Sequence, residues 1–161
     1  TTLRGLDPAR TLFVVVSKSF ATLETQVNAT TARSWFLERV GSLRALRQHF
    51  VGITANVPAA RAFGIEEHAI FPMWDWVGGR FSLWSAVGLP IALCAGPDAF
   101  LGLLAGARAM DEHFLGAAPD RNMPLLMALA GIWNYDFLGV TNQVVLPYDQ
   151  RLRLLPDYLQ Q

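Results

Sequence analysis

The sequence predicts an α/β fold with a mainly parallel sheet. Short apolar strand patterns alternate with helical patterns along the first half of the chain, as they do in proteins built on a parallel sheet. The first strand pattern, TLFVVV at 11–16, is a continuous β-branched run, which is typical of a strand buried on both faces.

The elements of the first half are expected in a regular order. They are a strand at 11–16, a helix at 22–40, a strand at 49–54, a brief helix at 58–63 and a strand at 69–74. Gly41 and Gly64 follow the two helices and are expected to end them. A glycine turn at 77–80 follows the third strand.

After the glycine turn the pattern changes to longer apolar helices. The expected elements are helices at 81–93, 98–114 and 122–138, a short strand at 143–146 and a final helix at 148–161 that bends at Pro156. Asn122 is the expected cap of the third of these helices, whose first turn accepts Pro124. The change predicts two domain parts, 1–80 and 81–161.

The composition is unusually apolar for a small free-standing domain. Hydrophobic residues make up 52% of the chain. Charged residues make up only 16%, compared with about a quarter in a typical soluble domain. We therefore expect that other protein normally covers much of this chain. Because it begins Thr1-Thr2, we also expect an excised or processed segment. The single cysteine, Cys94, permits no internal disulfide and is expected to be buried.

Charge and run length argue against two classes of partner. The net charge is zero, which provides no electrostatic attraction to nucleic acid or to an anionic membrane. The longest apolar runs fall short of the ~18–20 residues that a membrane-spanning helix needs, so no membrane partner is expected.

The Asp111-Glu112-His113 run spreads around a helix axis, and His49 and His68 are isolated. No metal site is therefore expected.

The first candidate site is the hydroxyl loop, residues 17–22, between a buried strand and a helix N-terminus. Open parallel sheets bind ligands at this position, and a helix N-terminus attracts anions. Three hydroxyls (Ser17, Ser19 and Thr22) and the ammonium of Lys18 suit a phosphate monoester. The alternative is ordinary capping, with Ser19 or Thr22 holding the helix start and Lys18 in solvent.

The second candidate site is Arg80 in the glycine turn. Paired glycines, Gly78 and Gly79, allow unusual dihedral angles and close approach of a ligand to the backbone. Arg80 would project from this turn with a fixed charge. It either clamps an anion or forms an ion pair with a local carboxylate such as Asp75.

Five segments of the sequence resemble the glucose-6-phosphate isomerase family, in the same order. They are DWVGGRFSLWSAVG at 75–88, SKSFATLETQVNA at 17–29, GARAMDEHF at 106–114, LLMALAGIW at 125–133 and LPYDQRLRLLPDYLQQ at 146–161. The resemblance implies a three-layer αβα fold of the sugar isomerase (SIS) type. This chain would hold the latter part of one SIS domain and the opening of a second, larger one.

The resemblance also implies a function and site residues. It implies a cytosolic homodimer that interconverts glucose 6-phosphate and fructose 6-phosphate without a metal or coenzyme. Ser17, Ser19 and Thr22 would bind the phosphate with Lys18 beside them. Arg80 would be catalytic, near the reacting carbons, and Gln161 would contact the substrate. Ser19, Ala21 and Leu23 differ from the family pattern, which has threonine, threonine and glutamine there.

The resemblance places the catalytic glutamate just beyond the Gln160-Gln161 pair, and the ring-opening histidine and lysine further downstream. The chain alone is therefore expected to be inactive. A rival from another class is a non-catalytic SIS module that binds a sugar phosphate and regulates a partner. Such a module is not expected to carry the 75–88 turn. A purely structural apolar domain would leave the hydroxyl loop unexplained.

Overall fold

The computed structural model describes residues 2–160, and the chain forms two compact units that meet in sequence between Phe100 and Leu101. The division at 80/81 expected from the sequence stays a prediction.

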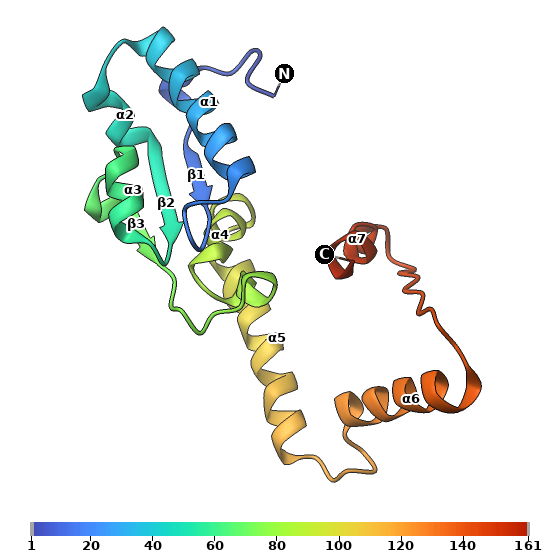
Figure 1. Ribbon diagram of the computed structural model, residues 1–161. Helices are drawn as coiled ribbons and strands as arrows, with labels where there is room; N and C mark the ends of the chain where they lie inside the picture. Colours follow the sequence, from blue (N-terminus) through green and yellow to red (C-terminus); the bar gives the residue numbers. More distant parts are fainter. Residues whose placement is uncertain (1, 161) are drawn as a thin grey trace. The chain divides into compact units, whose positions relative to one another are not determined.

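The first unit contains a parallel sheet of three strands (Figure 1). The strands are β1 (Phe13–Val16), β2 (Phe50–Thr54) and β3 (Ile70–Pro72), in the order β1-β2-β3. Val15 pairs with Gly52, and Gly52 pairs with Ile70. All three strands lie within the expected ranges, so the predicted α/β class with a parallel sheet is confirmed.

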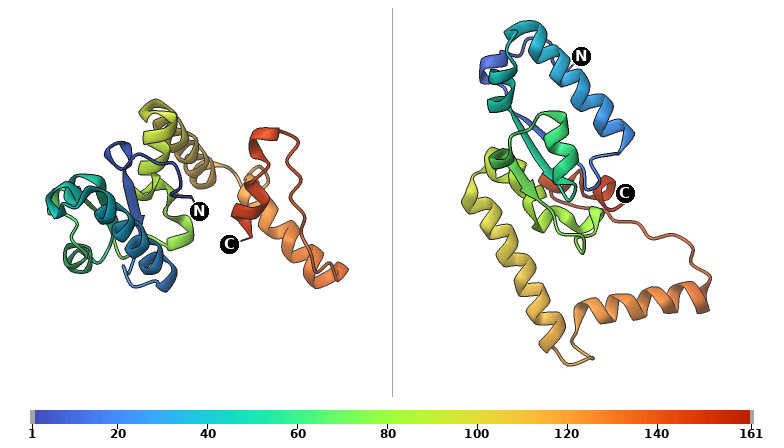
Figure 2. Two further views of the ribbon diagram at one scale, coloured as in Figure 1. Left: turned by 90° about the horizontal axis from the view of Figure 1, so that it is seen from above. Right: turned by 60° about the vertical axis from the view of Figure 1, so that its left-hand side comes forward.

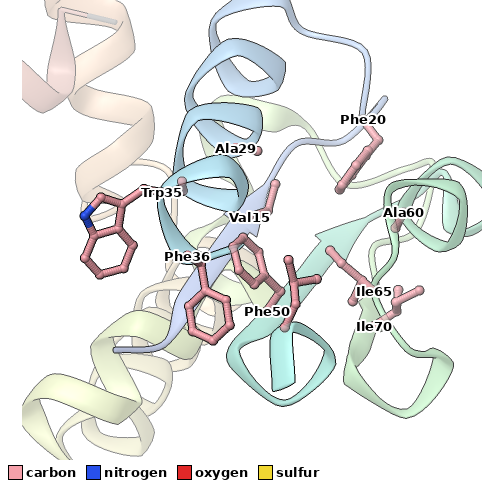
Figure 3. Packing of buried hydrophobic residues seen from close by; sticks show 11 residues of the cluster. Val15, Phe20, Ala29, Trp35, Phe36, Phe50, Ala60, Ile65 and Ile70 are labelled. Atoms are coloured by element: carbon pink, nitrogen blue, oxygen red, sulfur yellow. The ribbon is translucent and has the colours of Figure 1, made fainter. Parts of the chain in front are cut away.

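Helices cover one face of this sheet. They are α1 (Leu23–Val40), α2 (Leu43–His49) and α3 (Val57–Phe63), and a short 3-10 turn, η1 (Pro8–Arg10), precedes β1. Val15 and Phe50 point from the strands into a core with Phe36 of α1 and Ala60 of α3 (Figure 3). The sequence reading missed α2, although Ser42 caps it by accepting a hydrogen bond from the Ala45 amide.

Glycines end α1 and α3 as expected. Gly41 has a φ of 64° and Gly64 a φ of 108°, both in the left-handed region that side chains disfavour. The amide of each glycine donates back to a carbonyl of the last helical turn. The two glycines therefore fix where α1 and α3 stop.

The opposite face of the sheet packs against a segment of short helices. Val14 and Val16 alternate with Val15 along β1, so they point to this second face. They pack with Ile53, Met73 and neighbouring apolar side chains of the 3-10 turns. The segment comprises η2 (Glu67–Ala69) before β3, and η3 (Gly79–Trp84), η4 (Ala86–Gly88) and α4 (Leu89–Ala95) after it. Figure 2 shows α1 and α4 on different sides of the sheet, which completes three layers.

The prediction of one continuous helix at 81–93 was wrong. Ser85 has extended backbone angles, φ −98° and ψ −163°, which break the helix, and its hydroxyl accepts from the Val87 amide. Pro90 then lies in the first turn of α4, where its missing N–H costs no hydrogen bond. Cys94 is exposed in this chain, contrary to the expected burial.

The second unit consists mainly of helices. They are α5 (Pro97–Gly116), which begins in the first unit, α6 (Met123–Leu138), η5 (Gln150–Leu152) and α7 (Leu155–Leu159). Asn122 caps α6 as expected, because its Oδ1 accepts from the Leu125 amide. Asp149 forms an ion pair with Arg151, whose guanidinium lowers the pKa of that carboxyl group.

Two predictions in the second unit were wrong. Residues 143–146 form no strand. The final helix is not continuous from 148 either. It is divided between η5 and α7, and Pro156 lies in the first turn of α7 rather than at a bend. A proline suits a first turn because the N–H that it lacks has no intrahelical partner there.

Across residues 2–160, no helix is long and apolar enough to cross a bilayer. Many large apolar side chains are nevertheless exposed, including Leu115 and Trp133 of the long helices. This exposure agrees with the expectation that other protein normally covers them.

Candidate functional site

The hydroxyl loop leaves the carboxyl end of β1 with its first residue held in the sheet. The Ser17 amide donates to the Ile53 carbonyl oxygen at 3.1 Å, which extends the β1–β2 pairing by one residue. Ser17 is buried as a result. The position of its hydroxyl therefore depends on the sheet rather than on a mobile loop.

The two ends of the hydroxyl loop bring their hydroxyls together. Ser17 Oγ lies 3.3 Å from Thr22 Oγ1, close enough for a hydrogen bond. Thr22 is the N-cap residue of α1, yet its side chain makes no capping hydrogen bond. The hydroxyl of Ser19 accepts from the Ala21 amide within the loop, not from the helix. The capping alternative is therefore wrong for both residues.

Phe20 holds the middle of the hydroxyl loop in an uncommon conformation. Its φ is 53°, in the left-handed region, where a bulky side chain costs about 1–3 kcal/mol. The Phe20 amide donates to the Ser17 carbonyl, and the ring is buried against Phe63 at a centroid distance of 5.9 Å. Burial of the ring offsets the backbone strain. The prediction from sequence missed this role of Phe20. The available signal was an aromatic residue in a loop made mostly of polar residues.

The end of β2 supports the same loop. Thr54 is fully buried, and its Oγ1 donates to the Lys18 carbonyl at 3.0 Å. Asn56 Nδ2 donates to the Ser19 carbonyl at 3.1 Å, while Asn56 Oδ1 caps α3. The sequence reading missed both residues. Polar residues that follow a second parallel strand lie at the same sheet edge as those that follow the first, and this was the available signal.

The ammonium of Lys18 joins the hydroxyl loop to the segment that leads into the glycine turn. Lys18 Nζ donates to the Asp75 carbonyl oxygen at 2.6 Å and to the Val77 carbonyl oxygen at 3.0 Å. Lys18 is therefore not a solvated side chain, as the capping alternative required. The two segments singled out in the sequence are in direct contact.

Arg80 is the second residue of η3, and it is exposed. Ser82 Oγ donates to the Gly79 carbonyl at 2.6 Å and so stabilises the first turn of η3. The expected unusual dihedral angles of the paired glycines are absent, because neither Gly78 nor Gly79 has a positive φ. A Cβ at Gly79 would meet nothing within 4 Å. Close approach of a ligand remains as a reason for glycine there.

A hollow of about 450 Å³ lies over the hydroxyl loop, within the size range of ligand sites. It is lined by Lys18, Ser19, Thr22, Ala55, Asn56, Pro58 and Asp75. The hollow opens at the N-terminus of the 18-residue helix α1, whose dipole favours a negative charge. This arrangement can bind an oxyanion. Gln161, also expected at the site, lies outside the described residues.

Glu112 and His113 of α5 have hydrogen-bonding partners on different residues. The Glu112 carboxylate pairs with Arg108 at 2.7 Å, and His113 Nε2 accepts from the Met123 amide at 3.1 Å. Those two side chains have separate partners and do not converge.

The chain is similar to solved structures over nearly its whole length. A glucose-6-phosphate isomerase from Chlamydia trachomatis matches 99% of this chain with a TM-score of 0.87 and 36% identity. A hypothetical protein from Thermus thermophilus matches 96% with a TM-score of 0.76 and 33% identity. This chain covers 30% and 36% of those two chains, respectively.

Sequence comparison gives the same result. Glucose-6-phosphate isomerases from Hahella chejuensis and Pseudoalteromonas translucida are 57% and 54% identical over 99% of this chain. The chain spans 29% of the length of each of these relatives. The model of the phosphoglucose isomerase family matches residues 1–161, and the chain therefore belongs to that family.

Proposed function

We propose that the protein containing this chain interconverts glucose 6-phosphate and fructose 6-phosphate, an aldose–ketose isomerisation. The observation that carries the proposal is the family match over residues 1–161, together with relatives named for this activity. Those names also favour the isomerase over the sensor module. Because this chain spans only 29% of such relatives, the activity is a property of the longer protein.

The hydroxyl loop would bind the phosphate group of the substrate. Ser17, Ser19 and Thr22 offer hydroxyl donors, and the first turn of α1 adds backbone N–H groups and a partial positive charge. The absence of side-chain capping at Thr22 supports this role, because its hydroxyl is not already used to hold the helix. Lys18 belongs to the same site. A phosphate bound there would anchor one end of the sugar.

Arg80 would act at the other end of the substrate. Isomerisation moves a proton between adjacent carbons, and the intermediate is an enediolate with negative charge on oxygen. A carboxylate removes the proton from one carbon and returns it to the next, while a fixed positive charge stabilises the oxyanion. Arg80 supplies that charge in this proposal. The family resemblance assigns the carboxylate to a glutamate beyond Gln161. Gln161 itself would contact the substrate.

The remaining parts of the proposal follow from the family resemblance. They are a division into SIS domains near residue 80, a homodimer and a cytosolic location. The exposed apolar side chains of α5 and α6 support contacts with protein outside this chain.

The test is an isomerase assay on the purified full-length protein. Glucose 6-phosphate should be converted to fructose 6-phosphate, and part of the product formed in deuterium oxide should carry solvent deuterium at C1. The 161-residue chain expressed alone should show no turnover. Binding of a sugar phosphate to the full-length protein without turnover would instead favour the sensor module.

A further inference from the structure

Lys18 is the only lysine in a chain that otherwise uses arginine for its basic side chains. Its ammonium contacts two backbone carbonyls, those of Asp75 and Val77, which lie 57 and 59 positions further along the sequence. We propose that Lys18 is a positioning residue, whose side chain holds the glycine turn and Arg80 at a set distance from the hydroxyl loop. This inference rests on the proposed isomerase function.

The main chain of Lys18 is held by hydrogen bonds that do not involve its side chain. The Lys18 carbonyl accepts from Thr54 Oγ1 at 3.0 Å and from the Ala55 amide at 2.9 Å. Thr54 is fully buried in the last position of β2, so this anchor belongs to the sheet. One residue thus connects β2 through its backbone with the glycine turn through its side chain.

The chemistry of an ammonium fits this link. An ammonium carries three N–H donors, so it can serve two carbonyls that lie two residues apart. Hydrogen bonds from a charged donor are stronger than those between neutral groups. The two carbonyls have no intrahelical partner, because they precede η3. The lysine therefore satisfies main-chain acceptors that regular secondary structure leaves open.

Arg80 follows the second acceptor by three residues. Val77 is buried and packs with Ile53 and Met73 against the second face of the sheet. Its backbone leads directly into η3, where the Ser82 hydroxyl holds the first turn. A shift of the Val77 carbonyl would therefore move Arg80, which follows Val77 by three residues and is the second residue of η3. The ammonium would set how Arg80 stands relative to a phosphate held by the hydroxyl loop.

The competing role for the same ammonium is direct contact with the substrate phosphate. Lys18 lines the hollow, and the third N–H of its ammonium remains for such a contact. The two roles make opposite kinetic predictions. A phosphate ligand acts in the ground state and the transition state alike, so its loss weakens binding. A positioning residue acts on the geometry of the reacting end, so its loss lowers kcat.

The experiment compares Lys18→Met with wild type in the full-length protein. Methionine keeps an unbranched stem and removes the donors. We expect kcat to fall about 10–100-fold, because misplacing a catalytic group by about 1 Å has an effect of this order. The inhibition constant for inorganic phosphate should stay within about twofold. Lys18→Arg should recover part of kcat, since a guanidinium can still donate to carbonyls. Arg44→Met, which removes an exposed charge from α2, is the control.

A double-mutant cycle with Arg80→Ala separates positioning from general support of the fold. If Lys18 acts through Arg80, then adding Lys18→Met to Arg80→Ala should lower kcat by less than about twofold further. Independent effects would instead multiply.

Three results would overturn the inference and leave the proposed function intact. A phosphate inhibition constant raised tenfold or more with unchanged kcat would make Lys18 a phosphate ligand. A lower melting temperature with unchanged kinetics would make it a structural residue only. Full multiplication of the two effects on kcat would show that Lys18 does not act through Arg80. An inactive wild-type protein would overturn the proposed function itself, and the positioning role with it.

Discussion

The hydroxyl oxygens of Ser17 and Thr22 lie 3.3 Å apart, one at the end of β1 and the other at the start of α1. The first is fixed by the sheet and the second by the helix, so the pair joins the end of the strand to the start of the helix. If they bind phosphate, each hydroxyl contributes a donor to a charged oxygen.

Thr22→Val in the full-length protein should weaken substrate binding with little effect on kcat. Valine keeps the shape and removes the hydroxyl, at a cost of about 0.5–1.5 kcal/mol, or more where a charged oxygen loses its donor. The loss should appear as a raised KM and a raised inhibition constant for inorganic phosphate. Thr31→Val makes the same chemical change further along α1, where the hydroxyl bonds the Val27 carbonyl. An unchanged KM for Thr22→Val would remove this threonine from the phosphate site.

Arg80→Ala should lower kcat by about 10²–10³ while KM changes little. The charge of the guanidinium matters most when negative charge develops on the substrate oxygens, as for other oxyanion stabilisers. Because Arg80 is exposed, its truncation should change the free energy of unfolding by less than about 1 kcal/mol. Arg80→Lys should recover only part of the rate, since lysine lacks the planar donor fork.

The alternative role of Arg80, an ion pair with Asp75, predicts the opposite result. Truncation would then reduce stability and leave kcat near normal. Measuring kcat and the melting temperature on the same Arg80→Ala protein distinguishes the two, and Asp75→Asn should reproduce the stability loss only in the ion-pair case.

Gly79→Ala tests whether a ligand approaches the backbone of the glycine turn. The φ of Gly79 is not positive, and an added Cβ would meet nothing within 4 Å, so the melting temperature should not fall. A substrate that lies against this backbone would collide with the methyl group, and kcat/KM should then drop by about tenfold or more. Wild-type kinetics together with wild-type stability would exclude close approach at this position.

The strained backbone of Phe20 predicts an unusual order of substitutions. Inside a helix or strand, a protein with glycine is less stable than one with alanine by about 0.5–1 kcal/mol, because glycine loses more backbone entropy on folding. At a φ of 53° this order should reverse, and Phe20→Gly should unfold at a higher urea concentration than Phe20→Ala. Both variants should be less stable than wild type, since the buried ring is lost.

Ala29→Gly in helix α1 is the control for the Phe20 substitutions, because it should follow the ordinary order. If Phe20→Gly proves less stable than Phe20→Ala, then the left-handed backbone is not a source of strain.

Much of the first unit could be predicted because the signals are local. The β-branched run lies within β1, and the glycines that end α1 and α3 directly follow those helices. The place of the hydroxyl loop followed as well, since a strand followed by a helix puts its connection at the carboxyl edge of a parallel sheet. The break at Ser85 was missed because apolar residues continue on both sides of it, so the run at 81–93 has the composition of one helix.

The sequence by itself determined the strands β1 to β3, the helices α1 and α3 and the hydroxyl groups at one sheet edge, because each depends on neighbouring residues. Only the tertiary structure decided what Lys18 contacts and how Phe20 is held. The Lys18 ammonium bonds to carbonyls more than 50 positions away, and the ring of Phe20, whose backbone is left-handed, packs against Phe63 of α3. Hydrophobic patterns specify which face of an element is buried. They carry no information about which carbonyl from a distant segment will lie beside a given side chain, because packing of the whole unit sets that distance.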